Sequence, residues 1–313
     1  MIETLLQTLL NGAAAGGVYA LVALGYTLIF SVLGVINFAQ GALFSLGGYA
    51  TYLLMGGRIG VNGVWPGLGL PGGLPFPVAL FGAALLTALA SLLVERLAFA
   101  PLRRLGAEPL QSLITSLGAG VVLVNLLQIL MGAEGYAFPA AAQALGGLPE
   151  SLDIGGARIR TVQLLLLVIC AAAVLVLTLW LERSRGGKAL RAVAEDFTTA
   201  RLLGIDSDAM VRLAFAISGV LAGLGGGLIG LSVSLTGPYF GIGYGLKGLA
   251  VLVLGGLGSV PGAIAGGLLM GLAESLLPAG ASGWTDALAF AILFAVLLLR
   301  PSGLLGRVQV DKV

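Results

Sequence analysis

Residues 5–35 read LLQTLLNGAAAGGVYALVALGYTLIFSVLGV and contain no Asp, Glu, Lys or Arg. About 20 apolar residues in a helix cross a bilayer core of roughly 30 Å, so this stretch is long enough to span it. It lacks both a basic n-region and a small-residue cleavage site followed by a polar chain, so it predicts a retained span rather than a removable signal. The fold is therefore expected to begin with a transmembrane helix.

The rest of the chain repeats this pattern. Of its 313 residues, 58% are hydrophobic and only 10% are charged, whereas a soluble domain carries about 25% charged residues. The runs are continuously apolar, while the strands of a membrane β-barrel alternate over about 10 residues. The composition predicts an all-α polytopic membrane protein. Its charge-free runs cover residues 4–57, 59–94, 109–133, 162–181, 213–246 and 248–273.

The same composition excludes several classes of protein. The chain has no histidine and a single cysteine, Cys170, which rules out a histidine-based triad, an imidazole-ligated metal and an intrachain disulfide. A net charge of +2 without a basic tract gives no footprint for nucleic acid. No Walker A string is present, and with 51 glycines the three GxGxxG matches are chance. We expect neither an enzyme nor a chain that binds ATP or another cofactor itself.

Apolar length and Gly, Pro and charge punctuation divide the chain into nine helices. They form one transmembrane domain over residues 1–313. The number of membrane crossings is eight or nine, because the stretches around Asn37 and Ser259 can be either loops or Gly-rich breaks inside the membrane. The expected ranges are 5–33, 40–56, 78–98, 112–131, 162–181, 211–235, 244–257, 262–277 and 285–300.

Basic residues near the span ends give the orientation. If segment 182–212 is cytoplasmic, 12 of the 16 basic residues fall on that side, and the exceptions are Arg58, Arg158, Arg160 and Lys247. The C-terminus is then cytoplasmic. Nine crossings put the N-terminus outside, and eight put it inside.

Segment 182–212 holds 11 of the 30 charged side chains. Within it, residues 192–203 place Val193, Phe197, Ala200 and Leu202 or Leu203 at helical spacing, which predicts a short amphipathic helix. Gly204 suits a helix stop, and Asp206 or Ser207 suits the next N-cap. Such a helix can be a solvated loop element, lie on the membrane surface or dock on a cytoplasmic partner. The carboxylate pair Glu195 and Asp196 favours docking over a membrane-surface helix.

The string GGKALRAVAEDFTTARLLGI at residues 186–205 resembles the cytoplasmic coupling loop of permeases of branched-chain amino-acid ABC importers. Four other stretches are similar to that family in the same order, and together they span almost the whole chain. They are GVYALVALGYTLIFSVLGVINFAQG ending at Gly41, VERLAFAPLR ending at Arg103, VLGGLGSVPGAIAGGLLMGLAES ending at Ser275 and RPSGLLGR ending at Arg307.

This resemblance implies a permease that works by alternating access in a bacterial or archaeal plasma membrane. The implied partners are two cytoplasmic ATPase subunits, an extracellular or periplasmic substrate-binding protein and a second, longer permease. A stand-alone secondary carrier is the alternative from another class. The resemblance places ATPase docking on Arg191, Ala194, Glu195, Asp196, Ala200 and Gly204.

Two positions depart from the family. Gln40 stands where its members commonly have histidine, and Ala100 where they have arginine. The family also contains importers of urea, short amides and aromatic acids, so these remain alternatives to branched-chain amino acids as the substrate.

The substrate path is expected at two interruptions, GVINFAQG at residues 34–41 and GGLGSVPG at residues 255–262. Unwound backbone at membrane depth is tolerated where it lines a cavity or is buried in protein, and a half-helix N-terminus can face a carboxylate. The alternative is that these glycines only permit close helix packing. The expected path residues are Asn37, Gln40, Gly41, Ser259 and Gly262.

Charge inside the spans is scarce. Lys247, Glu274 and Asp286 lie near span ends, where each is expected to snorkel or pair rather than carry protons.

Overall fold

The computed structural model describes residues 2–138, 151–154, 157–277 and 283–306. Every one of the nine helices expected from the sequence is present, with ends shifted by a few residues. They are α1 (Ile2–Leu33), α2 (Gln40–Leu54), α3 (Phe76–Val94), α5 (Pro109–Met131), α7 (Thr161–Arg183), α10 (Ser207–Val233), α11 (Phe240–Gly255), α12 (Val260–Ser275) and α13 (Thr285–Leu299).

These helices fall into two length classes. Five are long and apolar enough to cross a membrane: α1, α5, α7, α10, and α3 with its continuation to Arg104. The others have 15 or 16 residues, which is about 24 Å at 1.5 Å per residue and shorter than a bilayer core of roughly 30 Å. The protein is therefore a polytopic membrane protein that combines long helices with shorter ones.

The helical fold expected from the sequence is present, and one short hairpin that was not expected accompanies it. Strands β1 (Ser151–Ile154) and β2 (Ala157–Arg160) form an antiparallel pair with Ser151 opposite Arg160. The sequences SLDI and ARIR alternate with a period of two and are separated in sequence by two glycines, which is a hairpin pattern. Apolar run length was the criterion for the helices, and it gives no signal for so short a strand.

A second difference concerns the end of α3. A π-helical turn, η1 (Glu95–Phe99), joins α3 to the short helix α4 (Ala100–Arg104), so that the apolar helix continues well past the expected end at residue 98. Pro101 is tolerated because it occupies the first turn of α4, where a backbone N–H is not needed.

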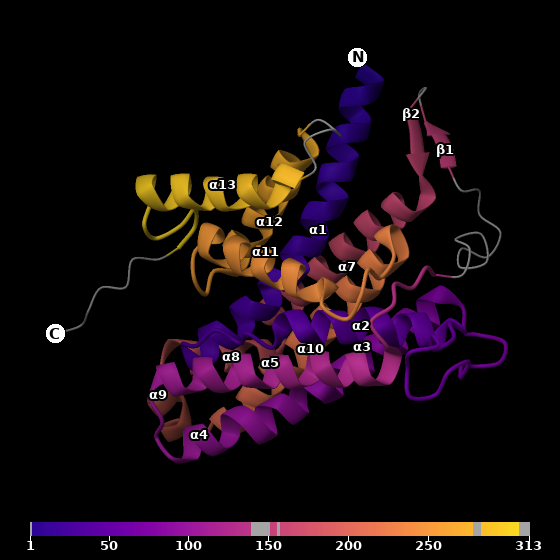
Figure 1. The fold of residues 1–313 in the computed structure, drawn as a ribbon. Coiled ribbons are helices and arrows are strands. Elements are labelled where there is room, and N and C mark those ends of the chain that lie inside the picture. Colours follow the sequence, from indigo (N-terminus) through magenta and orange to yellow (C-terminus); the bar gives the residue numbers. More distant parts are fainter. Residues whose placement is uncertain (1, 139–150, 155–156, 278–282, 307–313) are drawn as a thin grey trace.

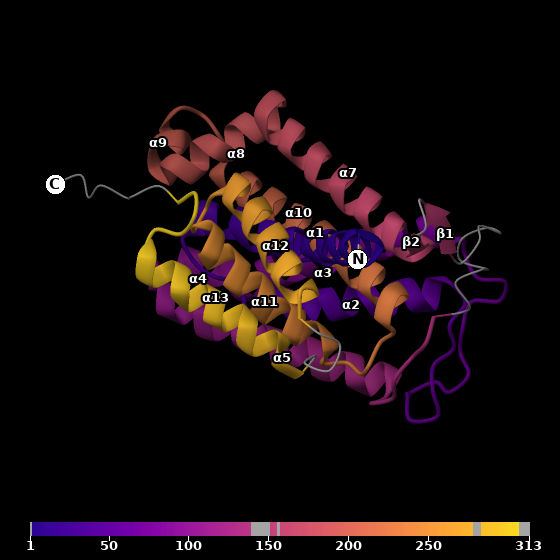
Figure 2. The same cartoon turned by 90° about the horizontal axis from the view of Figure 1, so that it is seen from above.

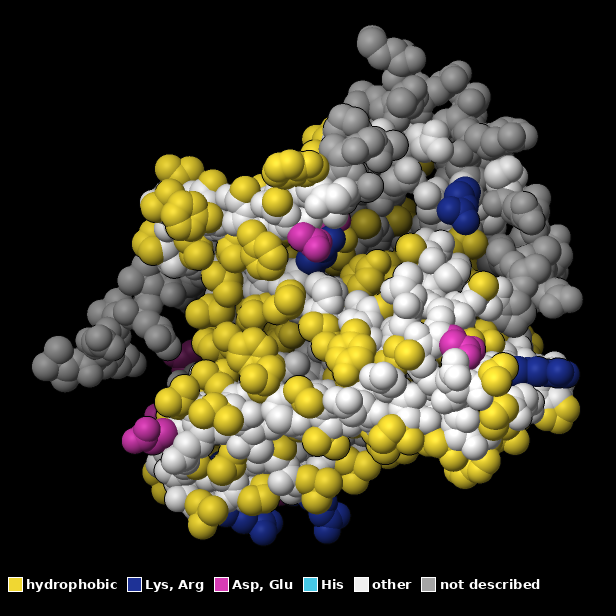
Figure 3. Space-filling view, in the orientation of Figure 1, with side chains coloured by type: hydrophobic (Ala, Val, Ile, Leu, Met, Phe, Trp, Pro, Cys, Tyr) yellow, Lys and Arg dark blue, Asp and Glu magenta, His cyan; other side chains and the backbone are white. Residues whose placement is uncertain are grey.

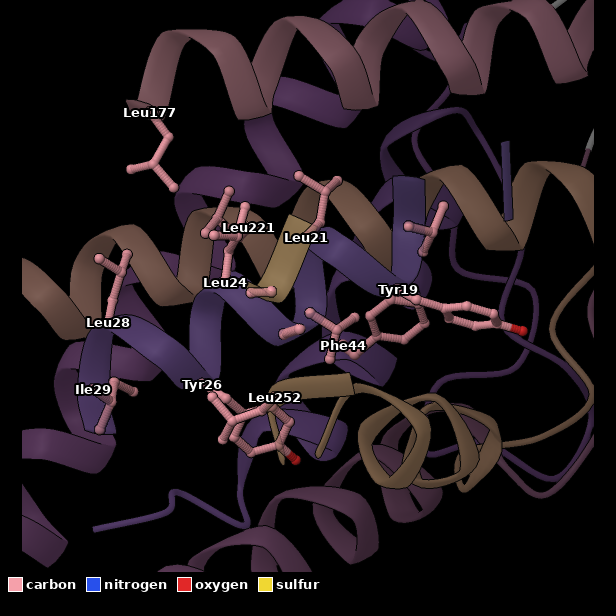
Figure 4. Packing of buried hydrophobic residues seen from close by; sticks show 14 of the residues in the cluster. Tyr19, Leu21, Leu24, Tyr26, Leu28, Ile29, Phe44, Leu177, Leu221 and Leu252 are labelled. Atoms are coloured by element: carbon pink, nitrogen blue, oxygen red, sulfur yellow. The ribbon is translucent and has the colours of Figure 1, made fainter. Parts of the chain in front are cut away.

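Helix α1 lies at the centre of the bundle and contacts α2, α7, α10, α11 and α12. Figure 4 shows its side chains Leu21, Leu24 and Tyr26 among Leu177 of α7, Leu221 of α10 and Leu252 of α11. Nearly all α1 side chains from Val18 to Ile29 are buried. An apolar helix covered on all sides needs no polar face, which explains why residues 5–35 show no amphipathic period.

The two ends of the molecule differ in their elements. In Figures 1 and 2, α4, α9 (Phe197–Leu202) and the C-terminal end of α13 lie at one end, and the β1–β2 hairpin lies at the other. The end with α4 and α9 carries Arg103, Arg104 and Arg201. The charge bias found in the sequence thus corresponds to one end of the bundle.

Glycines allow helices to approach closely where three of them meet. A Cβ on Gly223 of α10 would lie 2.7 Å from the Cα of Ala84 in α3, and a Cβ on Gly47 of α2 would lie 2.5 Å from the Cα of Gly223. Real Cβ atoms do not come so close to backbone atoms. The α2–α3–α10 junction therefore requires glycine at both positions.

Replacing Gly223 by valine tests this junction. The added side chain should separate the helices and cost about 1–3 kcal/mol or more, which lowers the midpoint of thermal unfolding in detergent. Gly118→Val in α5 is the matched control, because a Cβ there meets nothing within 4 Å. Equal shifts in both variants would contradict the packing role.

Candidate functional site: two helix interruptions and a coupling end

The first interruption separates α1 from α2. Gly34 has φ +67° and ends α1, and the Asn37 side chain accepts a hydrogen bond from the backbone N–H of Ala39 at 3.1 Å. The N–H of Phe38 donates to Ser116 of α5 at 3.2 Å. Residues 34–39 are thus held as a fixed turn against α5. The Asn37 amide nitrogen is buried without a hydrogen-bond partner in the described part of the chain.

Gln40, the first residue of α2, is fully buried and bonded to Ser218 of α10. The Ser218 hydroxyl donates to Gln40 Oε1 at 2.9 Å, and Gln40 Nε2 donates to the Ser218 carbonyl at 3.3 Å. A Cβ on Gly25 of α1 would lie 3.0 Å from the Ser218 hydroxyl. This amide therefore ties α2 to α10 in the space that Gly25 leaves open.

Gly41 lies where α2 crosses α11. A Cβ on Gly41 would lie 2.9 Å from the carbonyl oxygen of Gly241, and the Gly241 N–H donates to Ser45 at 3.0 Å. Asn37, Gln40 and Gly41 are thus brought together at the junction of α2 with α5, α10 and α11.

The second interruption forms the turn between α11 and α12. Ser259 caps α12, where its hydroxyl accepts from the Gly262 N–H at 3.1 Å. A Cβ on Gly262 would lie 2.7 Å from the Gly255 carbonyl carbon. The C-terminal segment pairs with this turn, since Leu304 and Leu305 donate to the carbonyls of Leu254 and Gly255 at 2.9 and 3.0 Å.

The two interruptions therefore have different surroundings. The first packs against α5, α10 and α11, whereas the second packs against the C-terminal segment. Gly258 of the second lies near Ser31 at the end of α1, the helix that the first interruption follows. Their assignment to the substrate path stays a prediction.

The amphipathic helix expected over residues 192–203 is two helices. Helix α8 (Arg185–Glu195) ends before Asp196, which has extended backbone angles and caps α9. The Asp196 carboxylate accepts from the N–H groups of Thr198 and Thr199 at 2.8 and 2.9 Å. The periodicity did not reveal this cap, because Asp196 also fits the polar face of one continuous helix.

The end of α9 and the start of α10 agree with the sequence. Gly204 has φ +85°, and the Ile205 N–H donates to the Ala200 carbonyl at 3.1 Å, as in a glycine-terminated helix. Of the two N-cap alternatives, Asp206 is the one used, and it accepts from the Ala209 N–H at 3.0 Å.

The expected docking residues divide into two groups. Arg191, Glu195, Asp196 and Gly204 are exposed and Ala194 is half-buried, whereas Ala200 is buried and holds α9 on the body of the protein. Leu202 and Leu203, one of which the helical spacing put on the apolar stripe with Ala200, are 83% and 76% exposed. The break at Asp196 resets the periodicity, so Ala200 faces the body of the protein and both leucines face outward.

Sequence reasoning missed a salt-bridge cluster beneath these helices. Arg103 bonds the buried Glu95 of the π turn at 2.9 Å and Asp208 of α10 at 2.9 Å. Arg201 of α9 lies 3.9 Å from the same Asp208. The motif VERLAFAPLR contains Glu95 and Arg103 eight residues apart, but only the fold brings Asp208 between Arg103 and Arg201.

The scarce charges of the spans lie together, and each is paired. Lys247 Nζ is 2.9 Å from Glu274 Oε1 and 3.1 Å from Asp286 Oδ1, and the Tyr19 hydroxyl donates to Glu274 Oε2 at 2.6 Å. Of the two alternatives for these residues, pairing is what the structure shows. Figure 3 shows acidic and basic side chains side by side next to α13, with hydrophobic side chains around them.

The chain is similar to known permeases over almost its whole length. It is 35% identical to the high-affinity branched-chain amino acid transport system permease protein LivH of Escherichia coli (strain K12), over 98% of this chain and 97% of the relative. It is 36% identical to the corresponding protein BraD of Pseudomonas aeruginosa, over 98% of each chain. A probable branched-chain amino acid transport permease protein LivH of Methanocaldococcus jannaschii is 28% identical over 98% of this chain and 96% of its own.

A protein family matches the same region of the chain. Residues 8–297, from within α1 to the end of α13, match the family described as branched-chain amino acid transport system, permease component. The chain therefore belongs to the family of permease components of branched-chain amino acid transport systems.

Proposed function

We propose that this chain is the membrane-spanning subunit of an ATP-driven ABC importer that carries branched-chain amino acids by alternating access. Its partners would be a second permease subunit, two cytoplasmic ATPases and an extracellular or periplasmic substrate-binding protein. The relatives in Escherichia coli and Pseudomonas aeruginosa are named as permeases for branched-chain amino acids, which supports the substrate class. Importers of urea, short amides or aromatic acids remain the alternative within this type, and substrate binding by the partner protein would separate them.

The surface of α8 and α9 carries this proposal. It combines exposed charge at Glu195 and Asp196 with two exposed leucines at the end of α9, Leu202 and the C-cap Leu203. An apolar patch flanked by charges is typical of a protein-docking surface. The Asp208–Arg103–Glu95 cluster lies directly behind α9 and joins α10 to the end of α3. Force applied to α9 by an ATPase would therefore reach two long helices of the bundle.

Variants of α9 test the docking surface. Leu202→Ala with Leu203→Ala should leave the protein folded but lower both uptake and the stimulation of ATP hydrolysis by the loaded binding protein, measured in proteoliposomes. Asp196→Ala should also uncouple, because losing the cap destabilises α9 by about 1 kcal/mol. Asp196→Ser, which keeps a capping oxygen, should restore coupling.

Leu68→Ala, an exposed leucine of the 55–75 loop at the opposite end, is the matched control. Normal coupling in both α9 variants would contradict the docking surface. Copurification without stoichiometric ATPases in mild detergent would contradict the importer and favour a carrier that acts alone.

The proposed orientation puts the end with α4, α8 and α9 in the cytoplasm, together with the C-terminus, in a bacterial or archaeal plasma membrane. Twelve of the 16 basic residues then lie on the cytoplasmic side, in agreement with the positive-inside rule.

Single cysteines in a Cys170→Ala background test the orientation in intact cells. Lys188→Cys of α8 should react with a membrane-impermeant thiol reagent only after permeabilisation, whereas Leu68→Cys should react from outside. Cys170 itself is buried in α7. Labelling of position 188 in intact cells would overturn the orientation and the coupling mechanism with it.

The path is proposed to pass the first interruption, where the amides of Asn37 and Gln40 concentrate hydrogen-bonding capacity in an apolar bundle. The unpartnered Asn37 nitrogen supports this placement, since a buried polar group without a partner costs about 1–3 kcal/mol. Gly41 would let the backbone at the start of α2, which lines the proposed path, approach α11 closely. Ser259 and Gly262 are proposed to support the path by holding the turn between α11 and α12 in place.

Gln40→Leu and Ser218→Ala separate a path role from a packing role. Gln40→Leu removes both hydrogen bonds to Ser218, and Ser218→Ala removes the one that its hydroxyl donates, so both should lower the unfolding midpoint. If Gln40 also lines the path, Gln40→Leu should slow leucine uptake at matched expression, whereas Ser218→Ala should leave it near normal. Equal uptake by the two variants would move the path elsewhere.

A further inference from the structure

The three charged residues near the start of α13 come from three helices. Lys247 lies in the middle of α11, Glu274 in the last turn of α12 and Asp286 in the first turn of α13. One lysine faces two carboxylates, so the group carries an excess of one negative charge. Lys247 also lies 5.5 Å from the centre of the Tyr19 ring of α1.

The two carboxylates are not equivalent. The Glu274 side chain is 10% exposed, forms an ion pair with Lys247 and accepts a hydrogen bond from the Tyr19 hydroxyl. It therefore neutralises the lysine at a site that is largely shielded from solvent. The Asp286 side chain is 73% exposed. A structural ion pair needs one acid for one lysine, and an exposed ion pair contributes little to stability. The Lys247–Asp286 contact is therefore the exchangeable one.

A zwitterion matches the exchange of that contact. Its carboxylate can replace Asp286 on Lys247 while its ammonium group pairs with Asp286, so every charge keeps a partner. A cation alone would be held beside Lys247, and an anion alone would be held beside Glu274. Only a solute with both groups brings a counter-charge with each of its own charges, so that its ammonium group offsets the carboxylate that it places beside Glu274.

The neighbouring surface of α11 suits an apolar side chain. Gly243 lies one turn before Lys247 on the same face of the helix, and a Cβ there meets nothing within 4 Å. The exposed side chains of Ile242 and Leu246 flank this open position. Tyr244, the next residue of α11, is stacked on Phe44 of α2 with ring centres 5.2 Å apart.

We infer that Lys247 and Asp286 form a binding site for a zwitterionic amino acid with an apolar side chain, the carboxylate on Lys247, the ammonium group on Asp286 and the side chain over Gly243. This inference rests on the proposed function and adds to it a solute site on the permease itself, separate from the two helix interruptions.

Gly243→Cys in a Cys170→Ala background reports on the site in the assembled transporter. We expect saturating leucine to slow its reaction with a small polar thiol reagent about tenfold or more, and leucinamide and 4-methylpentanoate, which lack one charge each, to have no such effect. Gly118→Cys, equally open in α5, is the control reporter and should react at the same rate with every solute.

Variants of the charged pair complete the test. Asp286→Asn and Lys247→Gln should each raise the leucine concentration needed for protection about tenfold or more. If Lys247→Gln fails to fold, Asp286→Asn still decides, because that side chain is exposed. Failure of leucine to protect, an unaltered protecting concentration in Asp286→Asn, or a Gly243→Cys unreactive without solute would each overturn the site. ATP-dependent leucine uptake in the same sample would leave the proposed function intact, whereas its absence would remove that function.

Discussion

The structure depends on the close approach of helix backbones at glycine. Lipid tails are as apolar as leucine side chains, so helices in a bilayer gain little from burying apolar surface against one another and associate instead through close van der Waals packing. Gly16 of α1 faces Gly267 of α12, where a Cβ would lie 2.8 Å from the Gly267 carbonyl oxygen. Gly47 and Gly223 serve the same purpose between α2 and α10. Such contacts allow α1 to be surrounded by other helices of the bundle.

Close packing leaves little room for unpaired polar groups, and most of those in the bundle are paired across helices. Gln40 bonds Ser218, Ser91 of α3 donates to the Phe215 carbonyl of α10 at 2.7 Å, and Lys247 bonds Glu274. Because an unpaired charge in this setting is costly, these pairs specify which helices are neighbours. The amide nitrogen of Asn37 departs from this pattern, and Asp286 is paired with Lys247 but exposed; each lies where we place a solute.

The two ends of the bundle are built for different tasks. At the end with α8 and α9, short helices with exposed charges and leucines stand on the Arg103 cluster, which links them to α3 and α10. Towards the other end, Tyr49 and Tyr52 both pack against Tyr136, with ring centres 5.8 and 5.0 Å apart. A surface supported by ion pairs and long helices moves with the body, so a partner bound there is mechanically connected to the membrane domain.

The sequence by itself determined the helices, because run length and the absence of charge depend only on the order of residues. It also determined the glycine stop at Gly204 and the concentration of basic residues at one end, since both are local signals. Only the tertiary structure decided that Asp196 divides the coupling segment, because a cap and a polar helix face look alike in sequence. It alone brought Lys247, Glu274 and Asp286 together and placed Gln40 on Ser218. Those contacts join residues far apart in the chain, and which side chains meet depends on how closely the intervening helices pack.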